Sequence, residues 1–138
     1  MRATIIPLEH AHTDNRRSIY EANGPDFSIQ QFAIYTEPAP QGLGNHFHRG
    51  KFEVFTILKG RGIVLLQQVS YDGVADGSVE ARDIKVGDVV YVPRLVAHTF
   101  HLEPGSEMHC FSSERFDVQD TDMHPFPLAR PVPVPVAA

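Results

Sequence analysis

The fold and the candidate site are indicated by one stretch of sequence, Asn45-His46-Phe47-His48-Arg49-Gly50-Lys51-Phe52-Glu53. Its two histidines are two residues apart, and residues at that spacing on a β-strand project to the same side. Both imidazoles can therefore point at one place. Glu53 follows His48 on the opposite parity, but Gly50 supplies a turn or break that lets the carboxylate face the same interior. A pair of histidines alone is weak evidence, because such a pair more often lies on a strand surface.

A third histidine comes from the stretch Gly87-Asp88-Val89-Val90-Tyr91-Val92-Pro93-Arg94-Leu95-Val96-Ala97-His98. Here a Gly-Asp turn starts a short apolar strand, Pro93 ends it, and a tight connection returns the chain so that His98 leads the next strand. If Glu53 and His98 face inward, so do the alternate residues of their strands, which are Phe55, Ile57, Phe100 and Leu102. Three imidazoles and one carboxylate suit one divalent transition metal (Zn, Mn, Fe, Ni or Co) rather than Ca or Mg.

The rest of the sequence predicts one all-β domain. The chain has 138 residues, including 11 prolines and 10 glycines, which leave few windows for an amphipathic helix. Short β-prone runs between turn signals are typical of a barrel or sandwich rather than of βαβ units. These runs are 27–35, 52–58, 62–69, 89–92, 97–102 and 107–112. The one helix candidate lies at 14–22, a segment that could equally be irregular. We assign residues 1–128 to the domain and residues 129–138, rich in Pro and Val, to an extended polyproline II tail.

Charge and hydropathy exclude several classes of partner. The chain has 12 Lys and Arg against 17 Asp and Glu, a formal charge of −5, and no run of like charge. Nucleic-acid binding has little support, because such binders usually carry a basic patch. No apolar run approaches the ~18 residues that span a bilayer, and the first residues do not resemble a secretory signal. We therefore expect a cytoplasmic protein with a small-molecule substrate, no membrane and no nucleic acid as partners.

The cysteine content and the predicted sheet give two further expectations. Cys110 has no second cysteine to pair with, and we expect it to be a small buried residue rather than a nucleophile. A sheet of this size leaves an edge strand that needs cover. We therefore expect a homodimer, in which the N-terminal segment could cross to the second subunit.

The two histidine-containing stretches resemble the paired motifs of the cupin superfamily, over residues 44–103. The first family motif has Gly, then His-x-His, Glu and Gly; this chain matches it at His46, His48, Glu53 and Gly60, with Pro40 in place of the leading Gly. The second has Gly, then Pro-x-Gly, His and Asn; here the matches are Gly87, Pro93 and His98, with Leu95 in place of Gly and Leu102 in place of Asn. The resemblance implies a single-domain cupin, a double-stranded β-helix or jelly-roll-like small barrel. It also implies that the ligands of its metal are His46, His48, Glu53 and His98.

A narrower resemblance lies partly outside these motifs. The segments 14–17, 27–32, 44–49 and 112–117 are similar in order to nucleotide-sugar cupins. These are the 3,4-ketoisomerases of dTDP-4-keto sugars and the terminal cupin of capsular-sugar reductases. The ketoisomerases typically carry Gln at the position of Glu53 and work without a metal, whereas the capsular-sugar cupins keep the carboxylate and bind zinc. Glu53 therefore implies the metal-bearing branch.

Three functions stay open on these grounds. The favoured hypothesis is an enzyme that isomerises or epimerises a nucleotide-linked keto sugar or a related small polar carbonyl compound, with a metal that stabilises the charge left when a proton is removed. An Fe(II)-dependent dioxygenase suits the same ligand set. A non-catalytic ligand-binding or sensor protein is the third hypothesis.

An isomerase needs a group that moves a proton and groups that hold the substrate. The candidates for proton transfer are His109, Tyr91 and His101. His101 has the parity opposite to His98 and is expected to face outward, Tyr91 more often packs than reacts, and the face of His109 is undecided. The candidates for binding a substrate phosphate or carboxylate are Arg49, Lys51 and Arg94, each of which could equally be a solvated loop charge.

Overall fold

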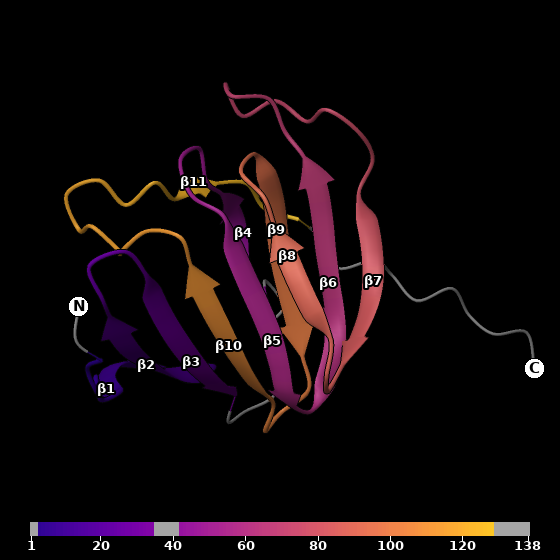
Figure 1. The fold of residues 1–138 in the computed structure, drawn as a ribbon. Coiled ribbons are helices and arrows are strands. Elements are labelled where there is room, and N and C mark those ends of the chain that lie inside the picture. Colours follow the sequence, from indigo (N-terminus) through magenta and orange to yellow (C-terminus); the bar gives the residue numbers. More distant parts are fainter. Residues whose placement is uncertain (1–2, 35–41, 129–138) are drawn as a thin grey trace, which may run out of the picture.

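The computed structural model describes residues 3–34 and 42–128, and in this part of the chain every regular element is a β-strand. The strands form two antiparallel sheets (Figure 1). The first contains, in spatial order, β1 (Glu9–Thr13), β2 (Arg17–Asn23), β3 (Ser28–Ile34), β10 (Glu107–Ser112), β5 (Glu53–Lys59) and β8 (Val89–Val92). The second contains β11 (His124–Pro125), β4 (Leu43–Phe47), β9 (Val96–Leu102), β6 (Arg61–Gln68) and β7 (Glu80–Lys85). The all-β prediction is confirmed.

The predicted tail, residues 129–138, and Pro40 of the first motif lie outside the described residues. The division of the chain at residue 128 stays a prediction. No described segment is a helix with the length and apolarity that a membrane crossing requires.

The core lies between the two sheets, which pack face to face. Its buried side chains come from both of them: Phe32, Phe55, Ile57, Val92, Met108 and Cys110 from the first, and Leu43, Val64, Ile84, Phe100 and Leu102 from the second. The predicted inward direction of the alternate apolar residues on β5 and β9 is therefore confirmed. A side chain that shares the face of Phe55 on β5 or of Phe100 on β9 points into the space between the sheets.

A smaller cluster covers the other face of the second sheet. It contains Phe47, Leu65, Val69 and Ala97, together with Leu128 from the end of the described chain. The segment that leads from β10 to β11 therefore returns to the second sheet, where β11 pairs with β4 (Figure 1). This return path brings residues near 122 beside the His-x-His stretch.

The helix predicted at 14–22 is wrong, because β2 occupies most of this segment. Asp14 looks like a helix N-cap, and its Oδ1 does accept hydrogen bonds from the backbone N–H groups of Arg16 (2.8 Å) and Arg17 (3.1 Å). Those bonds instead form an Asx-type turn between β1 and β2. Arg17 and Ile19 then share one face of β2 with Glu21.

The strands β1 and β7 were not predicted, because their sequences carry little apolar alternation. The five residues of β1 are all exposed, and β7 buries only Ile84. Each strand lies at an edge of its sheet. Edge strands are often polar, and pairing to a single neighbour does not require a hydrophobic face.

The Asp14 turn makes a prediction about pH. Burial opposes ionisation of Asp14, but hydrogen bonds from the Arg16 backbone, His12, the Arg16 guanidinium and the Arg17 backbone outweigh it and lower the pKa of this carboxyl. A carboxyl whose pKa is lower in the folded state stabilises the fold above its unfolded pKa, and this contribution is lost as pH falls. Asp14→Asn should therefore reduce the free energy of unfolding at pH 7 by roughly 0.5–1 kcal/mol.

Urea denaturation at several pH values measures this effect. The wild-type protein should lose stability between about pH 5 and pH 2, and the Asp14→Asn protein should lose less over that interval. Asp83→Asn, which changes an exposed carboxylate on β7, serves as the matched control and should keep the wild-type slope. Parallel losses in the Asp14→Asn and wild-type proteins would contradict the role given to Asp14.

Candidate metal centre

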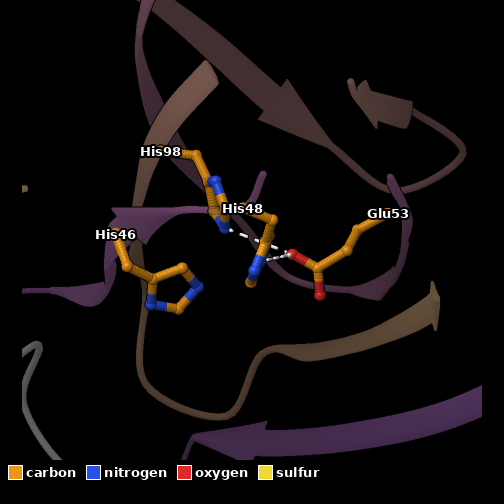
Figure 2. Close-up of side chains that lie close together, drawn as sticks. All are labelled: His46, His48, Glu53 and His98. Atoms are coloured by element: carbon orange, nitrogen blue, oxygen red, sulfur yellow. Dashed lines mark hydrogen bonds and ion pairs between the residues drawn. The ribbon is translucent and has the colours of Figure 1, made fainter. Parts of the chain in front are cut away.

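Four side chains from the two motifs meet between the sheets. His46 belongs to β4, His48 follows this strand directly, and His98 lies on the neighbouring β9, where it pairs with His46. Glu53 is the first residue of β5 in the opposite sheet. Figure 2 shows the three imidazoles and the carboxylate pointing toward one another. One ligand atom from each residue lies within 4.8 Å of those of the other three, a spacing that can enclose one metal ion.

The connection between the two strands explains how Glu53 joins the histidines. β4 ends at Phe47 and β5 begins at Glu53, so the intervening residues reset the parity as the sequence predicts. The residues between them leave one sheet and enter the other. His48 and His98 are almost fully buried, with 2% and 1% of their surface exposed, and Glu53 is 7% exposed. The centre is therefore closed to bulk water on most sides.

The hydrogen bonds of two histidines direct their Nε2 atoms at the centre. His48 Nδ1 lies 2.7 Å from the backbone carbonyl oxygen of Asp122, and His98 Nδ1 lies 3.2 Å from that of Val96. A carbonyl oxygen only accepts, so each Nδ1 carries the hydrogen and donates it. In a neutral imidazole, Nε2 then has no hydrogen and carries a free lone pair, which is the form in which histidine binds a metal.

The distances to Glu53 show that the centre needs a positive charge. His48 Nε2 is 2.6 Å and His98 Nε2 is 3.4 Å from the same oxygen, Glu53 Oε1 (dashed lines in Figure 2). An ionised carboxylate and a neutral Nε2 are both acceptors, so a contact of this length holds a proton between them, and a bound divalent ion would take the place of that proton. A divalent ion supplies such a charge, and the residues present fit one.

The pKa values at the centre favour the forms that bind a metal. Burial, together with the nearby charges of His98 and His48, lowers the pKa of His46 to about 3, so its imidazole is neutral at pH 7. Burial would raise the pKa of Glu53, but hydrogen bonds from His48 and His98 and the charges of these rings outweigh it, and the pKa falls below its usual range. A metal binds the deprotonated form of each ligand, which is the form that these shifts favour for His46 and Glu53.

Asp122 holds the His48 turn in place. Its carboxylate accepts hydrogen bonds from the backbone N–H of Arg49 and of Gly50, both at 2.8 Å, and its carbonyl oxygen accepts the one from His48. His124 Nε2 lies 3.0 Å from the same carboxylate. Sequence analysis did not identify Asp122, because 74 residues separate it from His48.

A cavity of about 240 Å³ opens beside the four residues, which line part of its wall. Two cations and two further carboxylates also line it: Arg17, Lys51, Glu21 and Glu114. Its apolar wall contains Phe32, Phe55, Phe100, Met108, Phe116 and Met123. The cavity can thus hold a small polar molecule against the cluster, with rings around it.

Of the three predicted substrate-binding residues, one lines the cavity and two do not. Lys51 lines the cavity and is buried, with 7% of its surface exposed. Arg49 lies over the ring of Tyr71 and donates a hydrogen bond from Nε to the Tyr71 carbonyl, so its side chain is used in the loop. Arg94 is exposed in the turn before β9 and does not line the cavity.

None of the three predicted proton-transfer residues lines the cavity. Tyr91 is 59% exposed on the outer face of β8. His109 is half-buried and alternates with the inward-facing Met108 and Cys110. His101 has the parity opposite to His98, and only 4% of its surface is accessible. The outer face of β9 is covered at this position, near Gly42, which sequence patterning cannot show.

Sequence analysis did not assign a cavity role to three of the polar residues on strands β2 and β3. Arg17 and Glu21 share the inward face of β2, and Gln30 lines the cavity from β3. The prediction of a helix in this segment hid the pairing of β2 with β3, which brings Arg17 and Glu21 to the cavity wall. Burial, with the charge of Arg16 beside it, lowers the pKa of the Arg17 guanidinium although Asp14 opposes the shift.

Leu95 stands where the second motif has Gly, and its contacts explain why the turn tolerates this change. Its backbone φ is +62°, in the left-handed region where the family has Gly. This conformation costs a non-glycine residue about 1–2 kcal/mol. Two contacts oppose that cost: the Leu95 N–H donates to the His48 carbonyl at 2.9 Å, and the side chain packs against the smaller cluster. The turn that leads to His98 is therefore kept.

The sequence comparison finds one matching family. The model described as the polysaccharide biosynthesis C-terminal domain matches residues 12–124. A search of curated proteins gives no match.

Solved structures with the same fold are cupins. CapF, a capsular polysaccharide assembling protein from Staphylococcus aureus, aligns with a TM-score of 0.71 and 22% identity over 88% of this chain and 32% of CapF. Streptomyces PAC13, solved with uridine, has a TM-score of 0.63 and 16% identity over 93% and 95% of the two chains. KdgF from Halomonas sp. has a TM-score of 0.58 and 20% identity over 78% and 87%. This chain spans about a third of CapF, and identities this low establish the fold alone. The predicted cupin fold is confirmed.

Proposed function

Because the chain is a cupin that belongs to the polysaccharide biosynthesis C-terminal domain family, we propose that it is a metal-dependent isomerase or epimerase of a nucleotide-linked keto sugar. The observation that carries this proposal is the convergence of His46, His48, Glu53 and His98 beside a cavity with charged walls. The match to a family of polysaccharide biosynthesis favours a sugar substrate. The similarity in fold to CapF, a capsular polysaccharide assembling protein, and to PAC13, which was solved with uridine, also favours a sugar substrate.

The four clustered side chains would hold a divalent ion of the set Zn, Mn, Fe, Ni or Co. When bound, such an ion supplies a Lewis acid that stabilises negative charge developing on a substrate oxygen. The chain itself prepares this position before substrate arrives, because carbonyl groups fix two of the imidazoles and burial keeps water out. Little reorganisation is then needed during the reaction.

Two cavity cations would bind the anionic part of the substrate. In the described part of the chain, neither Arg17 nor Lys51 forms an ion pair with a carboxylate. The Arg17 guanidinium lies over the ring of Phe32, 5.6 Å from its centroid, and its buried Nε has no hydrogen-bond acceptor among residues 3–34 and 42–128. A desolvated cation without a partner is costly, and a phosphate oxygen of a nucleotide sugar would remove that cost.

Glu21 is the cavity group that we assign to proton transfer. Gln30 Nε2 donates to Glu21 Oε1 at 2.9 Å, which orients the carboxylate on the cavity wall. Across three neighbouring strands, Glu21 is the register partner of Gln30 on β3, and Gln30 is the register partner of Cys110 on β10. Cys110 contacts Glu53, so Glu21 is in register with a residue that touches the cluster. For isomerisation, its carboxylate would take the proton from the carbon next to the carbonyl and return it to the carbonyl carbon, while the hydroxyl proton moves to the former carbonyl oxygen. For epimerisation, it would take the same proton and an acid on the opposite face would supply the replacement. No oxidant is consumed.

Deuterium exchange tests this proposal. Zn- or Mn-loaded protein is incubated in D₂O with dTDP-4-keto-6-deoxyglucose, and deuterium at the carbons next to the carbonyl is measured by NMR. The wild-type protein should incorporate deuterium, and Glu21→Gln should slow this by about 10²–10⁴-fold with unchanged metal content. Glu80→Gln, on the exposed β7, should exchange like the wild type. Absence of exchange in the metal-loaded wild type with both dTDP- and UDP-linked 4-keto sugars would overturn the proposal.

The alternatives predicted from the sequence give different results in related assays. Oxygen uptake by anaerobically iron-loaded protein with small diols, thiols or diketones would indicate a dioxygenase. Tight nucleotide-sugar binding without exchange would indicate a ligand-binding protein. The homodimer and the cytoplasmic location stay predictions, and sedimentation equilibrium measures the first of them directly.

A further inference from the structure

We infer that Cys110 is a positioning residue for the metal centre: its thiol holds Glu53 so that one carboxylate oxygen faces the histidines and the other does not. The inference rests on the proposed metal site and concerns a residue that sequence patterning treats as simple packing. Cys110 lies on β10, next to β5, and 1% of its surface is exposed. Its Sγ lies 3.1 Å from Glu53 Oε2.

The two oxygens of Glu53 have different neighbours. Oε1 faces His48 Nε2 and His98 Nε2, at 2.6 and 3.4 Å. Oε2 faces Cys110 and, among the described residues, has no other hydrogen-bond donor. An ionised carboxylate only accepts hydrogen bonds, so the thiol is the donor in this contact. Cys110 therefore fixes the rotation of the carboxylate about its own axis.

In this arrangement the Cys110 sulfur contacts a residue of the metal centre but is not itself a ligand atom. The cluster whose ligand atoms lie within 4.8 Å of one another contains Glu53 but not Cys110. A carboxylate held at Oε2 can offer Oε1 to an ion as a single ligand atom. Without the thiol, Oε2 would be buried with no donor, and the carboxylate would be expected to rotate toward the ion and bind through both oxygens.

Three substitutions separate positioning from packing. Cys110→Ser keeps a donor, Cys110→Val fills the space without a donor, and Cys110→Ala removes both. His109→Ala, one residue away on the other face of β10, is the matched control. If Cys110 only packs, Val should behave like the wild type and Ser should be the worse replacement. If it positions Glu53, the order is reversed.

The affinity and absorption spectrum of bound Co²⁺ provide the measurement. We expect Cys110→Val and Cys110→Ala to lower the Co²⁺ affinity by about 10–100-fold and to change the visible d–d bands, while Cys110→Ser stays within a few-fold of the wild type. The wild-type spectrum should lack a sulfur-to-cobalt charge-transfer band. Wild-type affinity and d–d bands in Cys110→Val, or a charge-transfer band that disappears with the cysteine, would overturn the positioning role.

A double-mutant cycle on metal-free protein distinguishes failure of this inference from failure of the proposed function. The unfolding equilibria of the wild type, Cys110→Val, Glu53→Gln and the double variant should show a coupling of about twofold or more between the two residues. If the wild type bound no Co²⁺, the proposed metal function would fail. The cycle would still show whether Cys110 and Glu53 interact. Additive effects in the cycle would overturn the inference whatever the metal result.

Discussion

Replacing His98 with Ala should lower the affinity for divalent ions by about 10³-fold and abolish deuterium exchange into the proposed substrate. The reason is that His98 supplies one of the four clustered ligand atoms, the one that comes from β9. Atomic emission analysis after dialysis against a weak chelator measures the metal, and circular dichroism verifies the fold. His98→Gln, which preserves more of the buried volume, is a second variant in case the Ala protein unfolds.

The control for His98 is another histidine of the same molecule. His109 lies on β10 with its side chain outside the cavity. His109→Ala should therefore keep both the metal content and the exchange rate. A His98→Ala protein that retains one tightly bound ion per folded chain would contradict the assignment of this residue as a ligand.

The second large effect is expected at Gly44. Its backbone φ is +109°, and a Cβ added there would lie 2.6 Å from the backbone carbonyl oxygen of His98. That oxygen belongs to the neighbouring strand, so an Ala side chain would push β4 away from β9 next to the pair His46 and His98. We expect Gly44→Ala to lower both the free energy of unfolding and the metal affinity, the latter by roughly tenfold or more.

Gly105 separates the clash from the backbone conformation. It also has a positive φ, +81°, but a Cβ added there has no atom of the described part of the chain within 4 Å. Gly105→Ala should therefore cost only the conformational strain, about 1–2 kcal/mol. Gly44→Ala should cost about 2 kcal/mol more, as measured by urea denaturation. Equal destabilisation by the two substitutions would contradict the close contact between β4 and His98.

The four-residue centre could be predicted because its geometry follows from local rules. The spacing of His46 and His48 and the parity of Glu53 with Phe55 depend only on the strand repeat and on a break at Gly50. His98 required the assumption that a second hairpin packs against the first. The family motif supplied that assumption, and the pairing of His46 with His98 confirms it.

The surroundings of the centre could not be predicted, because they depend on contacts between distant segments. Asp122 reaches His48 only because β11 returns to pair with β4. Cys110 reaches Glu53 through the pairing of β10 with β5, a register that no local pattern specifies. The polar cavity residue Glu21 was hidden for a different reason, since Asp14 forms a hairpin turn with hydrogen bonds that also suit a helix N-terminus.

Anomalous X-ray diffraction from crystals of metal-loaded protein, recorded at the absorption edge of the added metal, tests the central claim most directly. The account predicts one strong anomalous peak per chain, with His46, His48, Glu53 and His98 each contributing one atom at about 2.0–2.2 Å from it. A peak at any other place, or no peak after loading with Zn, Mn, Fe, Ni and Co in turn, would contradict it.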